Sequence, residues 1–242
     1  MTYTPRPMRR VLPLLALLLP VTAGAADLTV HQRVTAVGPR SETHEMTEYI
    51  TDTRRITDDP EHRTIVDLDA KTITMLDKKQ NTYTVTTFDE LHRQMDEARK
   101  HLDALPPEAR RMMQGSGGDV SLEPTGKTEK IAGYDAREYA IRGTGISGSV
   151  WVSEAISTPA KAADWDRFRG AVGGQMGPGA KLGEAMAKVN GFALRTQVRY
   201  ATGPVASGFD TEALSVAQQS PPADVTTLPA NARKLAPGTA GE

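Results

Sequence analysis

The pattern of hydrophobic and polar residues predicts a chain built mainly from half-buried β-strands. The alternation is most regular over residues 192–201, where Phe192, Leu194 and Val198 fall on one side of the chain. A period of two residues places one side of a strand in the core and the other in water. Runs rich in Thr, Val and Ile between turn residues predict further strands at residues 28–37, 43–51, 64–69, 72–76, 82–88, 120–122, 127–131, 134–142, 147–153 and 212–218.

The period changes to that of a helix after the first group of strands. Apolar residues recur there at helical spacing, with charged residues between them: Phe88, Leu91, Met95, Leu102 and Leu105. Two acidic residues at 89 and 90 suit a helix N-terminus, and two prolines at 106 and 107 end the pattern. The sequence predicts an amphipathic helix of about five turns, and further helical regions at 159–173 and 180–189.

This order of elements predicts an α+β fold. Consecutive hairpins with helices inserted between them favour a curved antiparallel sheet of about ten strands, an incomplete barrel, with two or three helices packed on its concave face. We expect one domain over residues 27–235, followed by a disordered tail at 236–242.

Residues 1–26 have the three-part pattern of a secretory signal peptide. Arg6, Arg9 and Arg10 precede an apolar run over residues 11–21, and small residues follow at 23–26. The apolar run is too short for the roughly 20 residues that span a bilayer, and no cysteine follows to accept a lipid. We therefore expect a periplasmic protein, with an extracellular location as the alternative, and no transmembrane anchor in its mature form.

Composition narrows the classes of function. The leader holds three of the 29 basic residues and none of the 30 acidic ones, so the mature chain has a formal net charge of −4. A mildly acidic chain argues against nucleic-acid binding, which needs a basic surface. The absence of cysteine excludes disulfides, thiol redox chemistry and thiolate metal sites.

Several segments resemble a bacterial exported family known as domain of unknown function 4412. The resemblance is carried by IVDLD at 65–69, ITMLD at 73–77, TYTV at 82–85, IAGYDAREY at 131–139, VWVS at 150–153 and the closing segment 228–235. It covers roughly residues 28–235. The family is similar in architecture to periplasmic lipoprotein carriers, which implies an incomplete barrel closed by helices over an apolar cavity. It supplies no catalytic residue.

One motif suggests a nucleotide site and fails on its context. Residues 143–148 spell G-x-G-x-x-G, but a dinucleotide fingerprint requires a helix after the glycines. The following residues, 149–152, read as a strand. We therefore interpret this segment as a hairpin turn.

The histidines offer no local metal or catalytic arrangement. None of the five forms the H-x-H, H-x-x-x-H or H-E-x-x-H spacing of a metal pair. His92 and His101 lie nine positions apart, and this spacing places them on opposite faces of the predicted helix. No G-x-S-x-G elbow marks a nucleophile. We expect surface histidines, no metal and no cofactor.

Methionine residues are the most suggestive set, because methionine adapts to irregular apolar partners. We hypothesise non-enzymatic binding or carriage of a lipid or acyl chain in a half-barrel cavity. The residues expected to line it are Phe88, Leu91, Met95, Leu102, Met112 and Met186. The same methionines would also suit an ordinary core. The alternative is a structural or protein-interaction module of the envelope with a fully packed interior, and an enzyme ranks third.

Overall fold

The computed structural model describes residues 27–106, 119–159, 178–201 and 207–236. The predicted signal peptide, Met112 and most of the helical region predicted at 159–173 lie outside these residues. So do positions 237–242 of the predicted tail.

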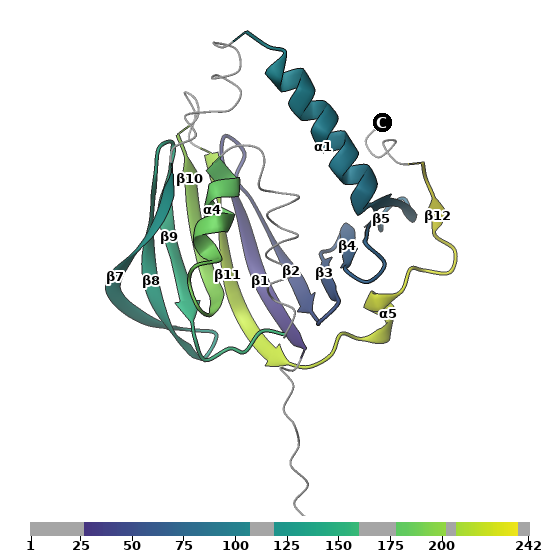
Figure 1. Cartoon of the computed structure of the whole chain (residues 1–242). Coiled ribbons are helices and arrows are strands. Elements are labelled where there is room, and N and C mark those ends of the chain that lie inside the picture. The colour runs from purple at the N-terminus through teal and green to yellow at the C-terminus, as the bar shows by residue number, and fades with distance from the viewer. Residues whose placement is uncertain (1–26, 107–118, 160–177, 202–206, 237–242) are drawn as a thin grey trace, which may run out of the picture.

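Twelve strands form one open, curved sheet (Figure 1). They are β1 (Leu28–Val37), β2 (Glu42–Ile50), β3 (Arg54–Asp58), β4 (His62–Asp67), β5 (Thr72–Asp77), β6 (Thr82–Thr87), β7 (Val120–Ile131), β8 (Tyr134–Gly143), β9 (Ile146–Ser153), β10 (Phe192–Tyr200), β11 (Ser207–Gln218) and β12 (Arg233–Lys234). Their order is β12-β6-β5-β4-β3-β2-β1-β11-β10-β9-β8-β7. Every pair is antiparallel except β12–β6. The α+β class with a curved open sheet is confirmed, with twelve strands instead of about ten.

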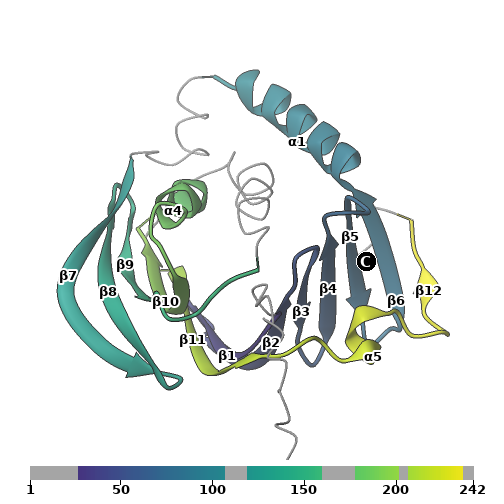
Figure 2. The ribbon, with the colours of Figure 1, turned by 60° about the horizontal axis from the view of Figure 1, so that its bottom comes forward.

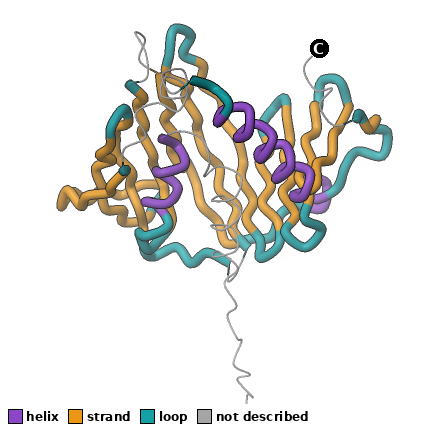
Figure 3. The backbone as a smooth tube through the Cα atoms, turned by 45° about the horizontal axis from the view of Figure 1, so that its top comes forward, coloured by secondary structure: helices purple, strands orange, loops and turns teal. Residues whose placement is uncertain are grey.

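Within the described residues, three helices accompany the sheet: α1 (Phe88–Asp103), α4 (Pro178–Met186) and α5 (Ala223–Thr226). The sheet bends into a trough; α4 lies inside it and α1 passes over its open side (Figure 2). Figure 3 shows α1 running obliquely across the strands. We call strands β7–β10 the α4 arm and strands β3–β6 the α1 arm.

The concave face can be followed from strand to strand, because directly opposed side chains share a face. Val198 belongs to the cluster that packs against α4, so it points into the trough. Val198 is opposite Phe209, and Phe209 is opposite Ala36. Alternation along β1 then brings Val30 to the same face, and Val30 is opposite Glu48 on β2. The concave face therefore continues without interruption into the α1 arm.

The outer face of the α1 arm has its own small core. Tyr49, Ile56 and Ile65 are directly opposed on β2, β3 and β4, and Val225 of α5 packs against them. The largest cluster joins strands from both sides of β1 and comprises Leu28, Val30, Ile50, Ile131, Ala136, Trp151, Ile156, Leu194 and Ala213.

The end of the β7–β8 hairpin curls over the outer face of the sheet. Arg195 on β10 donates to both carboxylate oxygens of Glu129 on β7, at 2.8 and 3.0 Å, although β9 and β8 lie between them. A flat sheet would separate β7 from β10 by about 14 Å. The shift in register between Pro124 and Thr128, with Gly126 at φ +81°, permits this bend.

Candidate ligand-binding site

Helix α1 begins and ends as its sequence predicts. The hydroxyl of Thr87 accepts a hydrogen bond from the backbone N–H of Glu90 at 3.1 Å, which is an N-cap. Acidic residues occupy the first turn, and Lys100 and His101 occupy the last, so both ends suit the helix dipole. The helix therefore has local reasons to form that do not depend on burial.

The apolar stripe of α1 is not buried in the sheet. Leu91, Met95, Ala98 and Leu102 are partly exposed, whereas most of the polar residues between them are exposed. No residue of α1 is buried, and the helix contacts the sheet chiefly at β6. The stripe therefore faces the protein side of the helix, and the sheet does not cover it.

Two rows of side chains cross all four strands on the concave face of the α1 arm. One row crosses the four strands through Arg55, Val66, Ile73 and Thr86, and the other through Thr57, Thr64, Met75 and Thr84. Met75 is 54% exposed and is the one large hydrophobic residue of the described chain that is exposed. This face is thus mixed, with threonines beside apolar residues.

The six predicted lining residues are distributed over different parts of the chain. Phe88, Leu91, Met95 and Leu102 all lie on α1, whereas Met112 lies outside the described residues. Met186 lies on α4 and packs, partly buried, against the cluster of Ile141, Ile146, Leu182 and Val198. The structure brings together the α1 residues only.

Met75 was missed as a candidate, although its sequence carried a signal. The alternation over 72–77 places Ile73 and Met75 on the same side of the strand. The pattern could not predict which face of the strand would stay exposed.

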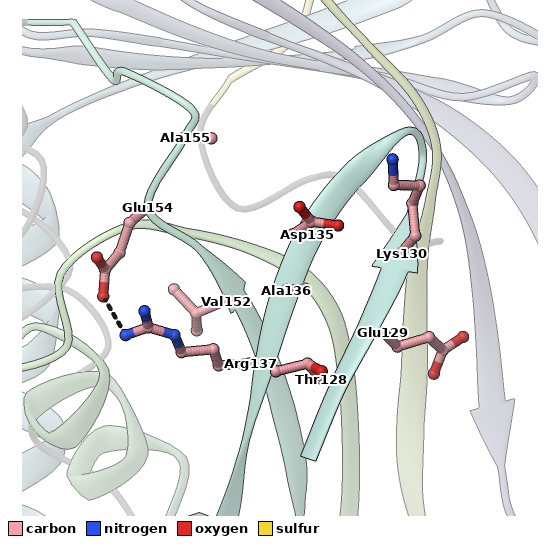
Figure 4. Close-up of a pocket in the computed structure, with 9 residues that line it drawn as sticks. All are labelled: Thr128, Glu129, Lys130, Asp135, Ala136, Arg137, Val152, Glu154 and Ala155. Atoms are coloured by element: carbon pink, nitrogen blue, oxygen red, sulfur yellow. Dashed lines mark hydrogen bonds and ion pairs between the residues drawn. The ribbon is translucent and has the colours of Figure 1, made fainter. Parts of the chain in front are cut away.

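Two cavities lie on the α4 arm, away from α1. One has a volume of about 520 Å³ and is lined by Thr128, Glu129, Lys130, Asp135, Ala136, Arg137, Val152, Glu154 and Ala155 (Figure 4). The other, of about 490 Å³, is lined by Val120, Ser121, Leu122, Tyr139, Glu154, Ala185, Lys188, Val189 and Asn190. Glu154 borders both and pairs with Arg137 at 3.1 Å. Charges of both signs line the larger cavity, so it does not offer the apolar surface predicted for a lipid chain.

The described ionisable side chains are mostly arranged as surface ion pairs. His31 and Arg33 both contact the carboxylate of Glu45, at 3.1 and 3.3 Å. Hydrogen bonds from these two residues lower the pKa of Glu45. Within the described ranges, no group of three His, Asp or Glu side chains is placed to hold a metal ion.

The segment predicted to be a hairpin turn is one. Gly143 ends β8, and β9 begins at Ile146. Gly148 sits within β9 at φ +147°, where an added β-carbon would lie 1.8 Å from a backbone oxygen of β10. At least this glycine of the G-x-G-x-x-G pattern therefore serves close strand packing.

None of the helices in the described ranges is both long enough and apolar enough to cross a bilayer.

The sequence matches, over residues 40–232, the family described as Domain of unknown function (DUF4412). No curated protein matches it. Among solved structures, the fold is similar to an uncharacterized conserved protein from Thermus thermophilus, at 8% identity and a TM-score of 0.47, over 88% of this chain and 91% of that one. It is also similar to a putative outer membrane lipoprotein-sorting protein domain from Vibrio parahaemolyticus, at 10% identity and a TM-score of 0.34, over 84% of this chain and 89% of that one. A LolA superfamily protein from Nitrosomonas europaea is similar as well, at 9% identity and a TM-score of 0.30, over 84% of this chain and 90% of that one.

Proposed function

The chain belongs to the DUF4412 family, and from its own geometry we propose that it binds a lipid or acyl chain without catalysing a reaction. The ligand would lie between the apolar stripe of α1 and the concave face of the α1 arm. The leader at residues 1–26 supports a periplasmic location for this activity.

The observation that carries the proposal is the apolar stripe of α1, which the described strands do not cover. An amphipathic helix normally gains its stability by burying its apolar face, yet no residue of α1 is buried. On the concave face of the α1 arm, Met75 is 54% exposed. An acyl chain between these two surfaces would remove apolar area from water on both sides, at about 0.8 kcal/mol for each buried methylene group.

The test compares two substitutions on adjacent positions of α1. Met95→Asp places a charge in the stripe, whereas Gln94→Asp places the same charge on the exposed side of the helix. We expect Met95→Asp to abolish saturable uptake of an apolar fluorescent probe and Gln94→Asp to preserve it. Circular dichroism of both variants separates loss of the site from loss of the fold.

A second measurement asks whether a natural ligand is present. Protein purified from its native envelope should carry lipid that native mass spectrometry detects. Absence of both lipid and probe uptake would refute carriage. It would favour the alternative of an envelope interaction module, to which the packed cluster beneath α4 lends support.

A further inference from the structure

The larger of the two cavities is bordered by side chains of both charges on one face of the β7–β8 hairpin. Thr128 of β7 lies opposite Arg137 of β8, and in the neighbouring row Lys130 lies opposite Asp135. The two rows are two positions apart on each strand, so the four side chains share a face. Glu154, just past the end of β9, borders the same cavity (Figure 4).

Two of the carboxylates at this cavity already have cationic partners. Nη1 of Arg137 donates to Glu154 at 3.1 Å. Glu129 accepts hydrogen bonds from Arg195 on both of its carboxylate oxygens. Their charges are compensated within the protein, so they are not the groups that a ligand would engage first.

Lys130 and Asp135 are the charged lining residues that remain. Although the two are directly opposed, neither side chain forms an ion pair or a hydrogen bond anywhere in the described ranges, and Figure 4 shows no bond between them. The groups left for a ligand are therefore one cation and one anion. A ligand with a single charge would meet repulsion from one of them, whereas a ligand with a charge of each sign is attracted by both.

The spacing of these two groups and the rest of the lining restrict the ligand further. Cβ atoms of directly opposed residues on antiparallel strands are about 5 Å apart, so the two ligand charges must lie close together. An α-amino acid carries its ammonium and carboxylate groups on one carbon atom, whereas the ends of an extended tripeptide are about 10 Å apart. The apolar part of the lining consists of Ala136, Val152 and Ala155, and the volume of about 520 Å³ leaves room for a side chain.

We propose that this cavity binds a free α-amino acid with an apolar side chain, with its carboxylate on Lys130 and its ammonium group on Asp135. The apolar side chain lies against Val152 and the two alanines. The site is independent of the lipid site proposed at α1, because none of its lining residues belongs to α1 or to the α1 arm.

Calorimetry at pH 6.5 tests the proposal with leucine and two of its derivatives. N-acetylleucine lacks the ammonium group, and leucine methyl ester lacks the carboxylate. Both ends of leucine are charged at this pH. We expect leucine to bind at least roughly tenfold tighter than either derivative, because each derivative has lost a hydrogen bond between charged groups.

Substitutions of the two unpaired residues assign the two ends of the ligand. Lys130→Met should bind leucine no tighter than leucine methyl ester, and Asp135→Asn should bind leucine no tighter than N-acetylleucine. Both residues are exposed, so we expect the fold to be preserved, which circular dichroism checks. Lys127→Met is the matched control, because Lys127 lies on the same strand but pairs with Glu138 at 3.1 Å; it should leave the affinity for leucine unchanged.

Three results would overturn the proposal. They are absence of leucine binding to the unmodified protein, equal binding of leucine and its two derivatives, and preferences that survive both Lys130→Met and Asp135→Asn. None of them bears on the lipid site, which the substitution Met95→Asp tests separately.

Discussion

Arg63 connects the C-terminal segment of the chain to the outer face of the sheet, and its removal gives a quantitative test of the fold. Nε of Arg63 donates to Asp58 at 2.6 Å. Nη1 donates to the backbone oxygen of Asp224 at 2.7 Å, within α5. The side chain is only 10% exposed. Replacement by methionine, of similar length, removes these bonds without opening a large cavity.

The expected loss in the free energy of unfolding depends on which ion pairs remain after the substitution. Loss of one partner of a buried ion pair costs about 3–5 kcal/mol. Asp58 retains Lys78 at 2.9 Å and is itself 20% exposed, so its charge stays compensated and the lower end of that range applies. We expect Arg63→Met to lower the free energy of unfolding by about 3 kcal/mol, which for a chain of this length is about 6–12 °C in Tm.

Removal of the Arg63 side chain should also have a local effect, at the pairing of β12 with β6. After α5, the chain pairs with β6 through two backbone bonds, from Arg233 to Asn81 at 3.0 Å and from Leu235 to Tyr83 at 2.8 Å. When α5 is no longer held, hydrogen exchange at these two amides should accelerate more than at the amides of β4 or β5.

Urea unfolding and hydrogen exchange measure the two effects, and Arg54→Met is the matched control. Arg54 pairs with Asp67 at 2.7 Å but is 44% exposed, so its loss should cost less than about 1 kcal/mol. If Arg63→Met costs no more than Arg54→Met, or if β12 exchanges at an unchanged rate, the reasoning is wrong.

Three further predictions follow from other parts of the structure. Gly148→Ala should destabilise the fold by more than about 3 kcal/mol, because its β-carbon would lie 1.8 Å from a carbonyl oxygen; Gly38→Ala, with open space around it, should be tolerated in the same urea titration. Arg195→Met should release the end of the β7–β8 hairpin, seen as faster hydrogen exchange at residues 131–134, and an unchanged rate there would contradict the curl. Burial raises the pKa of Asp58, but hydrogen bonds from its two cationic partners outweigh this and hold the pKa below its usual value. The stabilisation is therefore complete above about pH 3.9 and lost as pH falls through the lowered pKa, so the stability difference from an Asp58→Asn variant should shrink only in that acid range.

Regular alternation predicted most of the sheet. The strand at Leu28–Val37 agrees with its prediction at both ends, and β10 differs by one residue. β3 was missed because its sequence, RRITD, has one apolar residue and three charged ones. Its single buried residue, Ile56, is held by neighbours on β2 and β4, which a local pattern does not reveal. The segments predicted at 120–122 and 127–131 form one strand, because an irregularity in register absorbs the residues between them.

The candidate site was predictable only in part. Helical spacing identified which side of α1 is apolar, and the structure agrees. Spacing could not state what covers that side, because a helix built over a core and a helix built over a ligand share the same pattern. The ion pair between Glu48 and Arg55 escaped prediction for a similar reason. The two residues lie seven positions apart on different strands, and only the β2–β3 register brings them together.

The two arms of the trough differ in the side chains on their concave faces, and this difference supports the proposed site. On the α4 arm, Ile141, Ile146 and Val198 meet Leu182 of α4 in a packed cluster, so the protein supplies its own apolar cover. On the α1 arm the corresponding rows carry four threonines, one arginine and three apolar residues, of which Met75 is exposed. Such a surface would not bury α1 tightly, because threonine hydroxyl groups covered by an apolar stripe would lose water without gaining partners. A ligand with a polar head and an apolar chain satisfies both kinds of group at once. The composition of this one face therefore favours an amphiphile over both a purely apolar ligand and a self-packed interior.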